Sequence, residues 1–119
     1  MNTTKKRESK SKKALKVPFY DLELVRFLIK DGSGLDIAYA YEDLVFSEHG
    51  IFILQFIGES SQNLDCWFNK DCYENDRKTM FDSLMKSAVL NGFELTYKGR
   101  FLMTQKSESE EIDLQFENI

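Results

Sequence analysis

The segment from Ile51 to Ile57 constrains the fold more than any other part of this chain. Its sequence is IFILQFI, in which Gln55 is the one polar residue. A strand that is apolar on both faces belongs in the middle of a sheet that is at least partly covered on each side. The chain therefore has to build a layered domain around this strand, and its 119 residues are enough to bury such a core.

Other segments have the two-residue alternation of half-buried strands. One covers residues 35–41, where Leu35, Ile37, Tyr39 and Tyr41 alternate with small or acidic residues, and another covers 64–69. The alternation breaks at 44–46, which indicates a bulge or a change of face. Residues 93–103 predict a hairpin with a two-residue turn at Lys98 and Gly99. Residues 112–116 predict a final amphipathic strand.

Two helices are expected. The longer covers about residues 72–90, with Asp71 as its N-cap, Glu74 completing a capping box, and Asn91-Gly92 as its C-terminal stop. The other begins near Pro18 and ends at Asp31-Gly32. On this N-terminal helix, one face is predicted to carry Tyr20, Leu24, Phe27 and Leu28.

These elements predict a single α+β domain over residues 18–119. Short connections favour antiparallel neighbours, so we expect a mostly antiparallel sheet of about five to six strands with the long helix packed on one face. Residues 1–17 differ in composition, with seven Lys or Arg and one Glu, whereas residues 18–119 hold nine basic and nineteen acidic residues. The first seventeen residues are predicted to be a basic, flexible arm.

No pattern of a catalytic, cofactor or metal site is present. Cys66 and Cys72 are separated by five residues and the one histidine is His49, which is not the spacing of a zinc site. Cys66 is expected to be a buried core residue. Cys72, at the start of a helix, is expected to have a lowered pKa that makes it modifiable but not catalytic. We therefore expect no enzyme activity, no cofactor, no metal and no small-molecule substrate.

Aromatic residues on the strands favour a protein-interaction module, such as an adaptor, chaperone or inhibitor. If Leu64, Cys66 and Phe68 face the core, Trp67 points to the opposite side, where it is either a binding residue or part of a second core. Tyr39 and Tyr41 have the same two alternatives. The last strand adds Ile112, Leu114 and Phe116 as candidates, either docked on its own sheet or added to a partner's. Homodimerisation through an exposed sheet edge is a further expectation.

The basic arm supports an alternative function as a nucleic-acid accessory protein, because clustered cations neutralise phosphates. The residues concerned are Lys5, Lys6, Arg7, Lys10, Lys12 and Lys13. The arm lacks aromatic residues for base stacking, and it lacks the bulky apolar face that membrane binding requires. No apolar run is long enough to cross a bilayer. With two cysteines and no secretory signal, a cytoplasmic location is expected.

The expected order of elements, a helix, three strands, a helix and two strands in an acidic body, resembles that of the type III secretion chaperones. The resemblance covers architecture alone, and a strand stands at the C-terminal side where those chaperones have a helix. It implies an interaction module rather than an enzyme.

Overall fold

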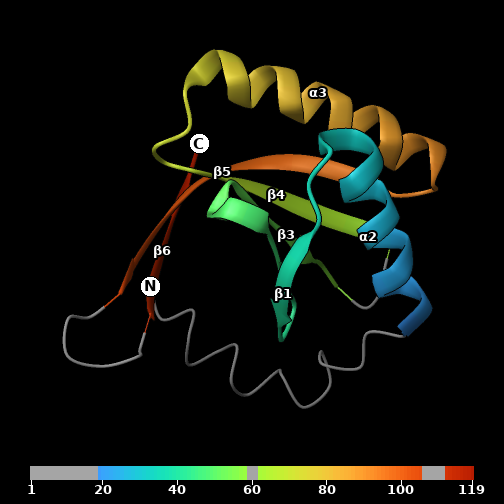
Figure 1. The fold of residues 1–119 in the computed structure, drawn as a ribbon, viewed down its shortest axis with the longest axis horizontal. Coiled ribbons are helices and arrows are strands. Elements are labelled where there is room, and N and C mark those ends of the chain that lie inside the picture. Colours follow the sequence, from blue (N-terminus) through green and yellow to red (C-terminus); the bar gives the residue numbers. More distant parts are fainter. Residues whose placement is uncertain (1–18, 59–61, 106–111) are drawn as a thin grey trace.

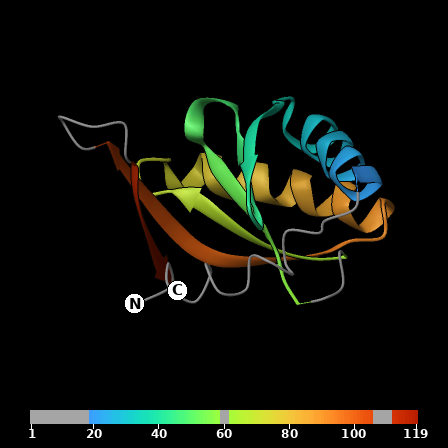
Figure 2. The same ribbon diagram turned by 90° about the horizontal axis from the view of Figure 1, so that it is seen from below.

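A six-stranded sheet and two helices make up residues 19–58, 62–105 and 112–119, the parts of the chain that the computed structural model describes. In chain order the elements are α2 (Phe19–Ser33), β1 (Ile37–Tyr41), β2 (Leu44–Ser47), the 3-10 turn η1 (Glu48–Gly50), β3 (Phe52–Phe56), β4 (Asn63–Asn69), α3 (Glu74–Leu90), β5 (Glu94–Gln105) and β6 (Ile112–Asn118). Both helices pack against the same side of the sheet (Figures 1 and 2). The predicted α+β class is confirmed.

The strands lie side by side in chain order, from β1 at one edge to β6 at the other. Every neighbouring pair is antiparallel except β4 and β5, which are parallel. The exception follows from α3, because a helix between two strands carries the chain back to the end of the sheet from which it started. As predicted, the apolar segment of β3 lies in the interior of the sheet.

The main core lies between the sheet and the two helices. Fully buried side chains of the strands, such as Phe52, Leu54 and Phe68, meet Leu84 and Ala88 of α3. The two helices also touch directly, since a Cβ added at Gly32 would come within 2.9 Å of the Cα atom of Leu84. The helix runs past the predicted stop at Asp31-Gly32 and ends at Ser33, where Gly34 adopts a positive φ of 80° and its N–H donates to the carbonyl of Lys30 at 2.9 Å.

The buried face of α2 differs from the prediction. Val25, Leu28 and Ile29 are fully buried, whereas Leu24 and Phe27 are exposed. The side chain of Tyr20 lies outside the described residues. Apolar residues occur almost all the way round this helix, so their spacing alone could not fix which side meets the sheet.

The break in alternation at residues 44–46 marks a hairpin. Tyr41 pairs with Leu44 across a two-residue turn of Glu42 and Asp43, and Glu42 adopts a positive φ of 55°. Residues 37–41 and 44–47 are therefore two strands joined by a hairpin turn, and not one strand with a bulge. A positive φ suits the twist of a two-residue hairpin turn, but glycine, asparagine or aspartate usually supplies it.

The start of α3 also differs from the prediction. The N-cap is Tyr73, whose side chain makes no capping hydrogen bond, so Asp71 and Glu74 do not form a capping box. Instead the backbone N–H of Asp71 donates to the Asn69 side-chain oxygen. At the other end the prediction is confirmed, because α3 ends at Leu90 and Gly92 has a φ of 82°.

The predicted hairpin at Lys98 and Gly99 is wrong, because residues 94–105 form the single long strand β5. The β4–β5 register shifts by one residue here, with Tyr97 opposite Cys66 and Gly99 opposite Trp67. Lys98 is thus the extra residue of a bulge. Strands on both sides, β4 and β6, hold this segment extended, and a local turn motif cannot reveal such neighbours.

Candidate interaction surface

A second apolar cluster lies on the side of the sheet opposite the helices. Five of its residues are buried, namely Leu44, Phe46, Ile53, Trp67 and Phe101. Three partly buried residues of β5 and β6 pack against them, namely Met103, Leu114 and Phe116. Neither described helix covers this side, as Figure 2 shows. We refer to it as the helix-free face.

Trp67 lies at the centre of the helix-free face, on β4. Its side chain is only 6% exposed, its indole ring lies 4.6 Å from the ring of Phe116, and its Nε1–H donates to Oε1 of Gln55 at 3.2 Å. Of the two alternatives for this residue, the structure supports membership of a second core. Trp67 is therefore placed to support the surface rather than to contact a partner directly.

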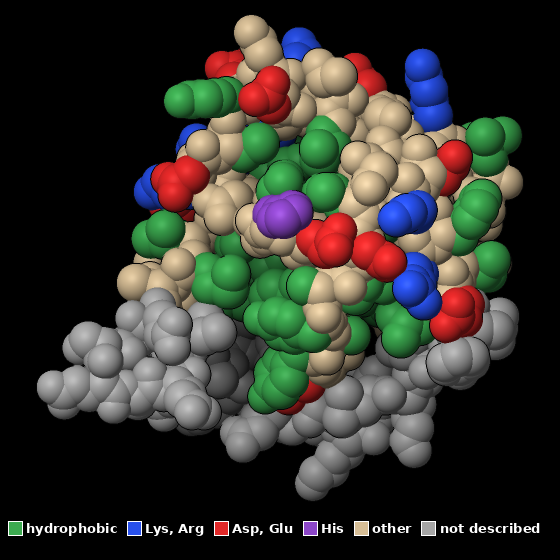
Figure 3. All heavy atoms as spheres, viewed as in Figure 1, with side chains coloured by type: hydrophobic (Ala, Val, Ile, Leu, Met, Phe, Trp, Pro, Cys, Tyr) green, Lys and Arg blue, Asp and Glu red, His purple; other side chains and the backbone are tan. Residues whose placement is uncertain are grey.

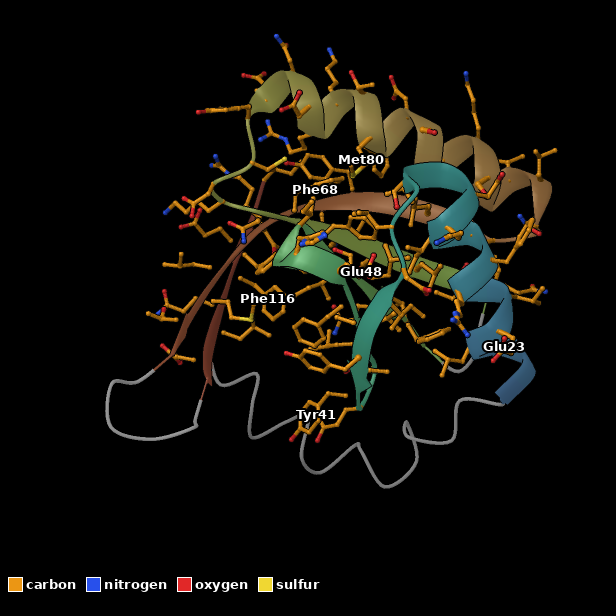
Figure 4. The ribbon with its side chains drawn as sticks, viewed as in Figure 1. Glu23, Tyr41, Glu48, Phe68, Met80 and Phe116 are labelled. Carbon is orange, nitrogen blue, oxygen red and sulfur yellow. The ribbon has the colours of Figure 1, made fainter. Side chains whose placement is uncertain are left out.

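Tyr39 and Tyr41 lie at the β1 edge of the same face and remain exposed, by 45% and 59%. The Tyr39 ring stacks on the buried Phe46 ring, with centroids 4.4 Å apart and planes 16° apart. Tyr41 lies at the end of the β1–β2 hairpin (Figure 4). We call these two residues the tyrosine margin.

The other predicted candidates lie on β6, at the opposite edge of the sheet. This strand docks on its own domain, since residues 112–118 pair with β5 from Gln105 to Gly99. Leu114 and Phe116 are half-buried against Trp67 and its neighbours. Of Ile112 only the backbone pairing with Gln105 is described. The structure thus brings Trp67, Leu114 and Phe116 together, and the tyrosine margin borders the same cluster at the opposite edge of the sheet, through the contact of Tyr39 with Phe46.

The helix-free face also carries acidic groups. Asp65 and Gln55 are paired across β3 and β4 on this side, and the Gln55 amide donates to Asp43 at 2.9 Å. Partial burial raises the pKa of Asp65, and the charge of Lys98 opposes that rise. Residues 35–50 around the tyrosine margin contain four carboxylates and no Lys or Arg. Asp36 pairs with Arg26 at 2.9 Å and Glu48 accepts from the backbone N–H of Asp36, so the carboxylates next to Tyr41 are those of Glu42 and Asp43 at the hairpin turn.

A hollow of about 840 Å³ lies on the helix side and contains both His49 and Cys72. Figure 3 shows the histidine beside this hollow, below α3. Asp71, Asp76 and Met80 also line it. Sequence spacing could not predict this grouping, because η1 and the segment before α3 are brought together only by the sheet. Among the described residues, no three His, Cys, Asp or Glu groups are placed to hold a metal ion.

The predicted lowering of the Cys72 pKa is wrong. Partial burial raises the pKa of this thiol, the charge of Asp76 raises it further, and Arg77 opposes the rise. Cys72 precedes the first residue of α3, and acidic residues occupy the first turn of that helix, which offsets the effect of its dipole. Cys66 is fully buried in the main core, as predicted, and burial raises its pKa well above the usual value.

The Cys72 thiol is expected to react slowly with alkylating reagents. Its raised pKa leaves a smaller thiolate fraction at pH 7–8 than an ordinary thiol has, so labelling by iodoacetamide should be slower than labelling of a cysteine-containing model peptide. Labelling rates of a Cys66→Ala variant between pH 7 and 10 would measure this. A rate that levels off below pH 8 would contradict it.

The basic residues of the alternative nucleic-acid site, from Lys5 to Lys13, lie outside the described residues. The arm therefore remains a prediction from the sequence.

Neither of the two described helices is long and apolar enough to cross a membrane.

Comparison with protein-family models, with curated proteins and with solved structures finds no match for this chain. The resemblance in element order to the type III secretion chaperones thus gains no support from these comparisons.

Proposed function

We propose that this chain is a non-catalytic protein-interaction domain that binds a partner through the tyrosine margin of its helix-free face. The observation that carries the proposal is the exposure of Tyr39 and Tyr41 beside a buried apolar cluster on a side of the sheet that no described helix covers. Tyrosine is enriched among residues that dominate binding energy, because it adds a large contact area with few rotatable bonds.

Within the tyrosine margin, the ring of Tyr39 packs on a buried ring. Phe46, on which Tyr39 stacks, is only 5% exposed and belongs to the cluster around Trp67. A ring held in this way loses little conformational freedom on binding, so more of its contact energy is available for affinity. Glu42 and Asp43, which follow Tyr41 in the hairpin turn, favour a partner with basic groups beside an apolar contact.

The hollow around His49 and Cys72 supports catalysis less well. A nucleophilic thiol needs a lowered pKa or an adjacent base, and both burial and Asp76 act in the opposite direction on Cys72. This consideration favours the binding proposal over an enzyme.

The test is the capture of partners from source-cell lysate by the full chain and by variants of it. Tyr39→Ser with Tyr41→Ser should reduce retention of the specific partner at least tenfold, as expected for two central contact residues. Tyr73→Ser is the matched control, because Tyr73 is even more exposed, at 78%, but precedes α3 on the helix side. A partner lost equally from the control and the double variant would refute the proposed surface.

The same experiment separates the nucleic-acid alternative. Nucleic acid retained at low salt by the full chain, and lost when residues 1–17 are deleted, would make the arm the binding element. In that case the tyrosine variants should retain as much nucleic acid as the unaltered chain.

A further inference from the structure

Two carboxylates lie beside the exposed rings of the tyrosine margin. Glu42 and Asp43 follow Tyr41 in the β1–β2 turn. The Gln55 amide that donates to Asp43 is neutral, so this hydrogen bond leaves the charge of the carboxylate in place. Residues 35–50 contain no Lys or Arg. The turn therefore adds negative charge next to exposed aromatic surface, a combination that suits a cationic and partly apolar segment.

Several other acidic residues of the domain have cations close to them. Asp36 pairs with Arg26 at 2.9 Å, and Glu117 pairs with Lys70 at 3.0 Å. The acidic residues in the first turn of α3 are followed directly by the basic residues 77 and 78. A positively charged segment is therefore attracted more strongly to the β1–β2 turn than to these places.

The first seventeen residues of the chain have the complementary composition. They contain seven Lys or Arg and one Glu, and the apolar residues Leu15 and Val17 occur at their C-terminal end. The chain thus carries in its own sequence what the tyrosine margin favours in a partner, namely basic groups beside apolar side chains.

The tyrosine margin is within reach of this segment. Residues 1–17 end just before α2, which begins at Phe19. The start of α2 and the β1–β2 hairpin lie toward the same side of the molecule, the lower side in Figure 1, where Glu23 and Tyr41 mark them in Figure 4. Seventeen residues span about 55–60 Å when extended, whereas the longest dimension of the molecule is 40 Å.

We propose that residues 1–17 bind the tyrosine margin of their own chain and so compete with a partner for it. The apolar side chains of the segment contact the two tyrosine rings, and its Lys and Arg side chains pair with Glu42 and Asp43. Because the segment is tethered to the same chain, its effective concentration at the margin is on the order of millimolar, so weak contacts are sufficient. The competition rests on the proposed function, whereas the contact itself does not.

Trypsin tests the contact in the full chain, because it cleaves after Lys and Arg and acts more slowly on a segment that is bound for most of the time. The initial rate of cleavage after residues 5–13 would be followed by mass spectrometry at low salt. This rate should be about threefold to tenfold lower in the full chain than in a synthetic peptide of residues 1–17. Raised salt should bring the two rates together, because it screens exposed charges.

Variants of the full chain locate the contact. Glu42→Gln with Asp43→Asn removes both charges without adding a trypsin site, and it should raise the rate of cleavage about threefold or more. Tyr39→Ser with Tyr41→Ser should also raise it, through loss of the apolar contact. Equal rates in the unaltered chain and the peptide at low salt would overturn the proposal.

Asp71→Asn with Asp82→Asn is the matched control, because it removes the same charge from exposed positions before and within α3. This pair should leave the cleavage rate unchanged. If it accelerated cleavage as much as the pair at the β1–β2 turn, net charge would set the rate and the proposed contact would be wrong.

The proposed function fails by a different result. Protection of residues 1–17, together with unchanged capture of the partner by the tyrosine variants, would refute the partner-binding surface and leave the contact standing. Loss of the partner from those variants without protection of residues 1–17 would do the reverse.

Discussion

Trp67→Ala should lower the free energy of unfolding by about 3–5 kcal/mol, the range for removing a buried aromatic side chain. The indole is 6% exposed, packs against Phe116 and donates a hydrogen bond to Gln55. Its loss would leave a cavity in the centre of the helix-free face, and the side-chain oxygen of Gln55 would lose this hydrogen bond. Urea denaturation followed by circular dichroism would measure the change.

Two further variants interpret this result. Trp67→Phe keeps most of the packing and should cost clearly less than alanine. Tyr41→Ser removes an exposed ring from the same face and should cost no more than about 1 kcal/mol. If Trp67→Ala lost less than about 1 kcal/mol, the indole would be a surface group, and it would rejoin the candidates for direct partner contact.

Gly99→Ala should be similarly damaging, at about 2–5 kcal/mol, although it adds only one methyl group. The new Cβ would overlap the backbone carbonyl of Glu117 in β6, and a φ of 155° is one that residues with side chains rarely adopt. Overpacking and backbone strain each cost about 1–3 kcal/mol. Because β6 pairs only with β5 among the described strands, relief of the overlap requires β6 to separate.

Hydrogen exchange would locate this damage. The amides of residues 113, 115 and 117 should lose protection in Gly99→Ala, while those of β3 and β4 keep it. Gly58→Ala is the matched control, because Gly58 also has a positive φ, of 71°, but its added Cβ would meet nothing within 4 Å. Equal losses of stability in the two variants would mean that backbone conformation, and not contact with β6, sets the cost.

The elements that the sequence predicts well are those specified by local patterns. The two-residue alternation located β1, β4 and β6, since a side chain's face in a strand follows directly from its position. Asn91 and Gly92 marked the end of α3, because glycine readily adopts the left-handed conformation needed there. The apolar content of residues 51–57 placed β3 inside the sheet and required apolar surface on both of its sides.

Tertiary structure decided the features that depend on neighbours distant in the sequence. Lys98 and Gly99 have the composition of a turn, yet β4 and β6 hold them in a continuous strand by pairing on both sides. Trp67 could have been core or surface by parity alone, and Phe116 from the far end of the chain buries it. His49 and Cys72 meet in one hollow because the sheet brings their segments together. Local sequence sets backbone preference and the alternation of faces, but burial and proximity arise only when remote segments pack.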